Sequence, residues 1–390
     1  HTGNQILPGF TAPKIKWVAE HEPENFERTA KILLPKDYIR YKLSGAFASE
    51  VSDASGTSLF DVKNRRWSPE MLDAFGVERA WLPEVAESPV VSSYVSQEAA
   101  QETGLLAGTP IVGGGGDQAA QAIGAGIIHE GDTSVTLGTS GVVFSASNSY
   151  KVDPQGVLHA FCHAVPNKWH LMGVMLSAAG SLRWFRDALA AWEVHQAAEA
   201  GVDPYEILTE KAAKVPPGSE GLIFLPYLTG ERTPYPNPNA RGVYFGLSLR
   251  HEKSHLVRAL LEGVAFGLRD SLELMKQLGL DLKTIRASGG GARSDLWLQI
   301  LANVFSKEIL RSSSDGGAAL GAAMIAGVGV GVFADFESAC QKTTGENEPI
   351  HPNQDQGLYE DFYQLYRSLY EPLKPLFDLD QRLVSKYLRE

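Results

Sequence analysis

Apolar positions in the first hundred residues recur mainly at the three- and four-residue spacing of helices. This spacing predicts helices over 23–34 and 35–45, the second of which ends at a glycine. Ser68 and Pro69 are typical of the cap and the first turn of a further short helix. Between these helices, residues 47–67 predict a loop followed by a short strand.

From residue 109 onward, apolar runs end in glycine turns. Residues 109–114 predict a short buried strand, and residues 132–147 predict a hairpin. The clearest helix covers 255–280, where one apolar stripe is formed by Leu256, Leu260, Val264, Leu268, Leu272 and Met275. Strand–glycine–helix units follow over 284–305 and 307–329. This alternation predicts an α/β fold.

Length, charge and cysteine content exclude several classes of protein. A chain of 390 residues is long enough for two domains. Its formal net charge of −11 and its lack of a basic run argue against nucleic-acid binding. We find no segment of roughly eighteen consecutive apolar residues, the length that a transmembrane helix needs, so such a helix is not expected. The only cysteines, Cys162 and Cys340, exclude a disulfide framework and favour a cytoplasmic protein.

Glycine turns follow four of the expected strands, at 113–116, 138–141, 289–291 and 316–317. Any one of them is most simply a tight turn. Backbone N–H groups at such a turn can also bind an anion, particularly where a helix begins just after it. None of the four matches the Walker A pattern or the dinucleotide-binding pattern. Together they favour a nucleotide-binding site.

A single carboxylate, Asp117, follows the run of four glycines. Aspartate is one of the best helix N-caps, and a short helix is expected after it. The alternative is a general base that takes a proton from a substrate hydroxyl. The next residue, Gln118, could hydrogen-bond a polyol or simply occupy the first helical turn.

Two other groups of side chains have a structural and a functional interpretation. His163 and His170 could bind a metal, but a histidine pair without a carboxylate is more typical of packed strands. Trp297 and three other tryptophans could stack on a sugar or an adenine ring, although such residues more often pack in cores.

Two segments, 9–21 and 242–262, resemble the signature sequences of the FGGY carbohydrate kinase family. Within this family, segments 33–57, 161–185 and 228–247 are most similar to bacterial xylulokinases. The resemblance implies an actin-like, ribonuclease-H-like α/β fold, with two domains around a central cleft. It also implies three regions along the chain.

The resemblance implies that residues 1–120 are the remainder of the N-terminal, sugar-binding domain, whose first part is missing. Residues 121–345 would form the C-terminal, ATP-binding domain. Residues 346–390 would form a helical tail that packs back on the N-terminal domain.

The resemblance also implies a role for particular residues. Asp117 matches the catalytic base, and Gln118 stands at a sugar-binding position where many xylulokinases have Asn. ATP-binding residues would be Gly138, Thr139 and Ser140 at the phosphates, Gly290, Gly291, Ala292 and Asp295 near the base or ribose, and Gly316 and Gly317 completing the pocket.

The implied reaction is the transfer of the ATP γ-phosphoryl group to D-xylulose, with Mg²⁺ on the phosphates and no named protein ligand. Asp117 would deprotonate the attacking hydroxyl. The resemblance leaves a homodimer open. It also leaves open another FGGY substrate (ribulose, gluconate or glycerol) or a non-catalytic ATP- or sugar-binding regulator.

One family feature has no counterpart in this sequence. The family begins with a strand and an Asp-x-Gly-Thr turn that forms the first phosphate loop. Residues 53–58 resemble that turn only superficially, and we interpret them as structural. We therefore expect a polypeptide of these residues alone to be impaired as a kinase.

Overall fold

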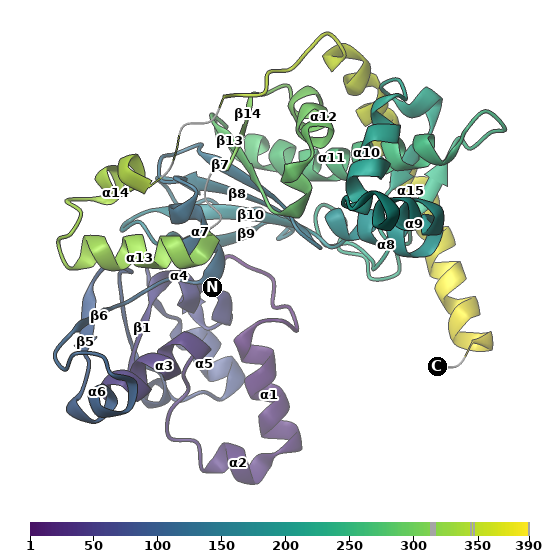
Figure 1. Ribbon diagram of the computed structural model, residues 1–390. Helices are drawn as coiled ribbons and strands as arrows, with labels where there is room; N and C mark the ends of the chain where they lie inside the picture. The colour runs from purple at the N-terminus through teal and green to yellow at the C-terminus, as the bar shows by residue number, and fades with distance from the viewer. Residues whose placement is uncertain (313–316, 344, 346–347, 389–390) are drawn as a thin grey trace. The chain divides into compact units, whose positions relative to one another are not determined.

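The computed structural model describes residues 1–312, 317–343, 345 and 348–388, which form two compact units (Figure 1). The first unit contains His1–Asp132, Ser145–Leu171 and the described residues of Ser313–Glu346. The second contains Thr133–Phe144, Met172–Ser312 and the described residues of Asn347–Glu390. The chain therefore passes between the units several times, unlike the three consecutive regions that the sequence predicts.

The first unit is built from short helices and short strands. Its helices are α1 (Thr11–His21), α2 (Pro23–Glu27), α3 (Pro35–Ser44), α4 (Val51–Ala54), α5 (Pro69–Phe75), α6 (Gln97–Thr103), α7 (Asp117–Gly124), α13 (Gly317–Gly329) and α14 (Phe336–Thr343). Its strands are β1 (Ala48–Glu50), β2 (Phe60–Asp61), β3 (Arg66–Trp67), β4 (Glu84–Ala86), β5 (Val91–Tyr94), β6 (Pro110–Val112) and β9 (His159–Cys162). Strands β1 and β4 pair in parallel, whereas the pairs β2–β3 and β5–β6 are antiparallel.

The second unit has longer helices. These are α8 (Ala179–Leu189), α9 (Ala191–Ala200), α10 (Pro204–Ala213), α11 (Lys253–Gln277), α12 (Asp295–Phe305) and α15 (Gln356–Tyr387). Its strands are β7 (Thr133–Leu137), β11 (Ile223–Leu225), β12 (Val243–Phe245), β13 (Ile285–Ser288) and β14 (Ile309–Arg311). Strands β8 (Gly141–Ser147) and β10 (Trp169–Met175) contain residues of both units.

The main sheet has the strand order β14-β13-β7-β8-β10-β9, and β13 pairs in parallel with both β7 and β14. Val135, Leu137, Ile285 and Ala287 have no exposed surface, and Ser134 on the opposite face of β7 is also buried. Burial on both faces is typical of parallel strands covered by helices. Strands β7 and β8 are neighbours, which confirms the predicted hairpin.

Several predicted helices are confirmed and others differ. The helix that starts at Pro35 ends at Gly45, whose φ of 72° is left-handed, and the Ser68 hydroxyl caps α5. The helix predicted over 23–34 stops at Glu27. The Ile32 N–H donates instead to the Trp81 carbonyl at 2.8 Å, and the following X-Pro junction disfavours helix.

The C-terminal helix α15 belongs to the second unit, where it packs on α11 and α12. Four tyrosines on one face of it are buried, and two of them hydrogen-bond to carboxylates of α11 at 2.7 Å: Tyr359 to Glu262 and Tyr363 to Asp270. The predicted packing of this tail on the N-terminal domain is corrected accordingly.

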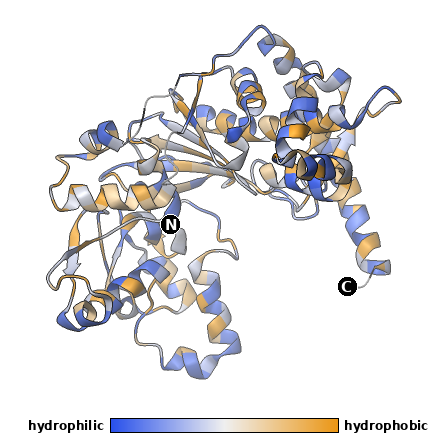
Figure 2. Ribbon diagram, in the orientation of Figure 1, coloured by the Kyte–Doolittle hydropathy of each residue, from blue (hydrophilic) through white to orange (hydrophobic). Residues whose placement is uncertain are grey.

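Helix α13 is apolar along its length and lies against α7 in the first unit (Figure 2). The two backbones are so close that a Cβ atom on Gly321 would collide with the Ala120 carbonyl, and one on Gly124 with the Gly317 carbonyl. Glycine at these positions therefore fixes how α7 packs. No helix in the described ranges is long and apolar enough to cross a membrane.

We expect Gly321→Ala to destabilise the intact protein by about 1–3 kcal/mol, because the added methyl group forces the two helices apart. Denaturant unfolding measures the loss. Gly357→Ala is the matched control, since a Cβ there meets no atom within 4 Å. Equal stability of the Gly321 variant and the control would show that the packing tolerates a side chain.

Candidate active site

A cavity of about 420 Å³ in the second unit is surrounded by glycine-containing turns. One turn follows β7, and another follows β13. Because these strands are parallel and adjacent, with Thr136 opposite Ser288, both turns lie at the same end of the sheet. The lining residues are Leu137, Gly138, Thr139, Ala179, Gly180, Leu182, Arg183, Asp203, Tyr205, Glu206, Thr209, Gly290, Gly291, Arg293, Ser294 and Trp297.

Glycine is required where these turns touch. Gly289 has a φ of 85°, and a Cβ atom there would lie 2.7 Å from the Leu137 carbonyl oxygen. A Cβ atom on Gly180 would lie 2.6 Å from the Thr139 carbonyl oxygen. Both separations are shorter than real Cβ contacts, so a side chain at either glycine would displace the turn after β7.

The turn after β7 is hydrogen-bonded to the start of helix α8. The Ala179 N–H donates to the Gly138 carbonyl at 2.9 Å, and the Gly180 N–H donates to the Thr139 carbonyl at 3.1 Å. The positive end of the α8 dipole is therefore at the cavity wall, where it favours an anionic ligand. Arg183 and Arg293 add two positive side chains to the lining.

The structure brings together four of the predicted ATP-binding residues: Gly138, Thr139, Gly290 and Gly291. Ser140 and Ala292 adjoin the lining without being part of it, and Ala292 is buried. Asp295 begins α12 with its side chain 89% exposed and paired with Arg311.

Of the remaining two predicted residues, the structure describes only Gly317. Gly317 begins α13 in the first unit and is not among the lining residues, and Gly316 lies outside the described residues.

Sequence reasoning missed the side of the cavity formed by α8 and α10. Arg183 and Tyr205 come from these helices. The Ala-Ala-Gly sequence that ends in Gly180 follows β10, and a search for further strand–glycine junctions would have found it. Trp297 forms part of the wall but is buried, with its indole N–H donating to the Leu261 carbonyl at 3.0 Å.

In the first unit, the four glycines connect β6 to α7 by a path close to other main chain. The Gly113 N–H donates to the Val90 carbonyl at 2.9 Å, and the Gly114 N–H donates to the Ser88 carbonyl at 3.0 Å. Gly114 has a left-handed φ of 78°. The run ends at Asp117, whose carboxylate is exposed.

Asp117 is the first helical residue of α7, and Gly116 holds the N-cap position. The interpretation of Asp117 as the N-cap is therefore wrong. Its Oδ1 atom accepts the Gln118 N–H at 2.8 Å, and the Gln118 amide donates to Oδ2 at 3.4 Å. The two residues predicted to contact sugar thus lie together at the start of one helix.

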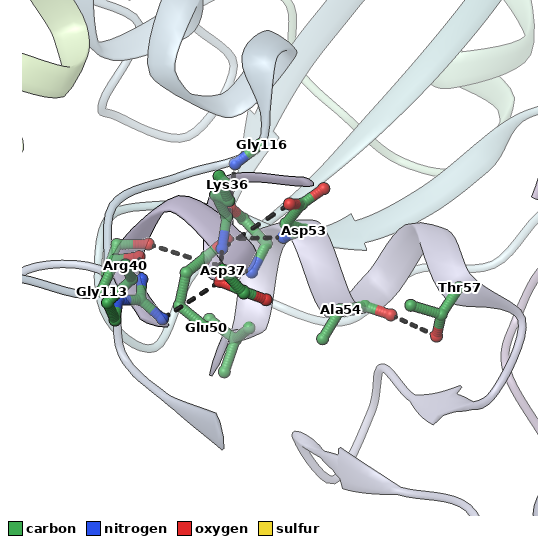
Figure 3. A network of polar contacts seen from close by, with 12 residues as sticks. Lys36, Asp37, Arg40, Glu50, Asp53, Ala54, Thr57, Gly113 and Gly116 are labelled. Atoms are coloured by element: carbon green, nitrogen blue, oxygen red, sulfur yellow. Dashed lines mark hydrogen bonds and ion pairs between the residues drawn. The ribbon is translucent and has the colours of Figure 1, made fainter. Parts of the chain in front are cut away.

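A group of charged side chains lies beside the glycine run (Figure 3). Lys36 Nζ lies 2.7 Å from Asp37, 3.6 Å from Glu50 and 3.6 Å from Asp53. Burial acts to lower the pKa of Lys36, but these three carboxylates outweigh it and raise that pKa. Asp53 is partly exposed, and burial raises its pKa to about 6 against the opposing charge of Lys36.

The two candidate metal-binding histidines have structural contacts. The His163 ring lies 3.1 Å from the Ile127 carbonyl through Nε2, and its Nδ1 atom accepts the Val165 N–H at 2.9 Å. Burial lowers the pKa of His163 to about 3 and lowers that of His170 as well. Among the described residues, no group of three or more His, Cys, Asp or Glu side chains is placed to hold a metal ion.

Two family models together match most of the chain. The N-terminal domain of the FGGY family of carbohydrate kinases matches residues 1–124, and its C-terminal domain matches residues 133–330. The chain belongs to the FGGY family of carbohydrate kinases. The predicted α/β, actin-like fold is confirmed by the solved structures of family members that it resembles.

Xylulose kinase from Escherichia coli is 40% identical over 96% of this chain and 75% of its own length. Xylulose kinase from Lactococcus lactis is 40% identical over 95% of this chain and 72% of its own length. A solved kinase of the same description from Brucella ovis is 40% identical with a TM-score of 0.87, over 96% of this chain and 75% of that one. This chain thus spans about three quarters of the length of these relatives.

The raised pKa of Asp53 predicts a pH-dependent stability. Between the pKa of about 3.9 in the unfolded chain and about 6 in the folded one, the folded state binds more protons, so its stability falls as the pH rises through 6. We expect Asp53→Asn to remove this loss. The variant should gain about 1–2 kcal/mol relative to the parent between pH 4 and pH 7.

Denaturant unfolding at a series of pH values measures this gain. The control is Asp73→Asn, which removes an exposed carboxylate of the same unit. If the difference in unfolding free energy between Asp53→Asn and the parent did not change with pH, burial would not raise the pKa of Asp53.

Proposed function

We propose that this protein phosphorylates D-xylulose with ATP to give D-xylulose 5-phosphate and ADP. The observation that carries the proposal is its similarity to xylulose kinases over almost its entire length, with the exposed Asp117 and the half-buried Gln118 together at a helix start. The glycine-lined cavity of the second unit supports ATP as the phosphoryl donor.

In the proposed reaction, Asp117 orients the terminal sugar hydroxyl and accepts its proton. The hydroxyl oxygen forms a bond to the γ-phosphorus as the bond from that phosphorus to the β,γ-bridging oxygen breaks and ADP leaves. Asp117 suits this role because its carboxylate is exposed and its direction is fixed by the Gln118 N–H. The Gln118 side chain would contact a second sugar hydroxyl.

The second unit would bind the nucleotide through its two glycine turns. The turn at Gly138 and Thr139, together with the α8 N-terminus, suits the phosphates. The turn at Gly290 and Gly291 suits the adenosine end. Mg²⁺ would be held by phosphate oxygens and water and would neutralise charge during transfer.

We also propose further nucleotide contacts, a location and an assembly state. They are nucleotide contacts by Ser140, Ala292, Asp295, Gly316 and Gly317, as well as a cytoplasmic location and a homodimer. A second candidate substrate is gluconate. It is favoured by a gluconokinase from Bacillus subtilis that is 32% identical over 99% of this chain and 73% of its own length.

We expect Asp117→Asn to lower sugar-dependent ADP formation by about 10²–10⁴-fold, because the amide cannot accept the hydroxyl proton. A coupled ADP assay measures the rate, and calorimetry with ATP checks that nucleotide affinity stays within about two-fold. Asp361→Asn, an exposed change on α15, is the control. An unchanged rate for Asp117→Asn would contradict the role of the base and favour a non-catalytic regulator.

We expect Gly180→Ala to weaken ATP binding by about ten-fold or more, because its methyl group would push the Thr139 carbonyl, and with it the phosphate-binding turn, out of place. Titration with a non-hydrolysable ATP analogue measures the affinity. Gly357→Ala is the control, because a Cβ atom there meets no atom within 4 Å. Gly201 is not suitable as a control, because a side chain at its positive φ would strain the backbone. Unchanged affinity of the Gly180 variant would place the nucleotide elsewhere.

A further inference from the structure

We propose that Ser52 and Arg40 are positioning residues for Asp117, because their side chains hold the two ends of the glycine run that precedes it. The inference rests on the proposed function, in which Asp117 is the base. Neither residue was among the candidate site residues predicted from the sequence.

At the Asp117 end, the contact is a hydrogen bond from main chain to side chain. The Gly116 N–H donates to Ser52 Oγ at 3.0 Å. Gly116 is the N-cap of α7, so its position sets where the helix and its first residue, Asp117, begin. Glycine has no side chain to restrict its φ and ψ angles, so the run can adopt many backbone conformations. The bond to Ser52 limits the conformation of the run at Gly116.

A buried carboxylate fixes the direction of the Ser52 hydroxyl. Ser52 Oγ–H donates to Glu50 Oε1 at 3.0 Å, which leaves the oxygen lone pairs for the Gly116 N–H. Glu50 has no exposed surface and also accepts the Ser52 and Asp53 N–H groups at 2.7 and 2.8 Å. The Ser88 hydroxyl donates to it at 2.9 Å, so Glu50 is held from two segments.

At the opposite end of the run, Arg40 binds a carbonyl. Its Nη2 atom donates to the Gly113 carbonyl, and Nη1 donates to the Ala48 carbonyl at 2.6 Å and to Asp37 at 3.0 Å (Figure 3). Arg40 and Asp37 are both buried. A guanidinium with several donors in one plane can bridge these groups, which a lysine cannot do.

These two contacts act on catalysis through geometry. Helix α7 is held against α13, while the glycine run connects it to β6. A displacement of about 1 Å at a catalytic group can cost about 10²-fold in rate. Loss of either contact should therefore lower kcat, with little effect on ATP binding in the second unit.

Ser52→Ala in the intact protein tests the proposal. We expect sugar-dependent kcat to fall by about 10–100-fold, with the KM for ATP within two-fold, and Ser52→Thr to restore at least a third of the parent rate because its hydroxyl can make both bonds. Ser55→Ala is the matched control. Ser55 is equally buried and bonds to Val51 and Cys162, not to the glycine run.

A purely structural role for Ser52 predicts a different result. Both alanine variants would then lose stability in unfolding experiments while the folded protein kept the parent kcat, and this outcome would overturn the proposal. Should Ser52→Ala fail to fold, Arg40→Lys decides. It keeps a charge beside Asp37 but loses the planar donors, and an unchanged kcat would equally overturn the proposal.

Combination with Asp117→Asn separates this inference from the proposed function. Once the base is absent, Ser52→Ala should lower the remaining rate by less than about two-fold, since the two changes act through the same group. Equal effects in both backgrounds would contradict positioning of Asp117. Full activity of Asp117→Asn alone would contradict the proposed function itself.

Discussion

Close approach of main chain to main chain is the constraint on which both units depend. In the second unit, glycines at 180 and 289 allow two segments to touch the end of β7, and a Cβ at either would meet a carbonyl oxygen. In the first unit, Gly321 lets α13 lie against the Ala120 carbonyl of α7. Hydrogen bonds and helix dipoles weaken steeply with distance and angle. Only such close approaches therefore let the backbone N–H and C=O groups of neighbouring segments interact.

The buried charged residues beside the glycine run hold nearby main chain in position. Burial of Arg40, Asp37 and Glu50 costs free energy, and a buried ion pair is weak evidence of stability. Each of them nevertheless contacts the main chain or a group that does. The consequence is a loop with four glycines whose ends are fixed by polar contacts from other elements.

Local sequence predicted the turns of the nucleotide cavity because glycines directly follow the predicted strands along the chain. Gly138 and Gly290 could therefore be identified before the fold was known. Arg183 and Tyr205 could not, since only the folding of α8 and α10 brings them to the cavity. The identification of the family came from a resemblance in longer segments, which no single motif provides.

Two local errors have clear physical causes. Asp117 follows a glycine that itself takes the N-cap position, so the cap was predicted one residue too late along the chain. The short helix α4 was missed because its cap is Glu50, whose carboxylate accepts two N–H groups of the first turn although glutamate is not a usual cap residue. In the first case a tertiary contact, from the Gly116 N–H to the Ser52 hydroxyl, holds the glycine at the cap position, whereas in the second the unusual cap is local to the chain.

Transfer of the ATP γ-phosphoryl group to the C5 hydroxyl of D-xylulose is the activity to which both units of this FGGY family member contribute in the proposed function. The most direct test compares kcat/KM of the intact protein for D-xylulose, D-ribulose, D-gluconate and glycerol, with the product identified by phosphorus NMR. We expect the highest kcat/KM for D-xylulose, with the phosphoryl group on its C5 oxygen. A higher value for another substrate, or no sugar-dependent product at all, would contradict the proposed function.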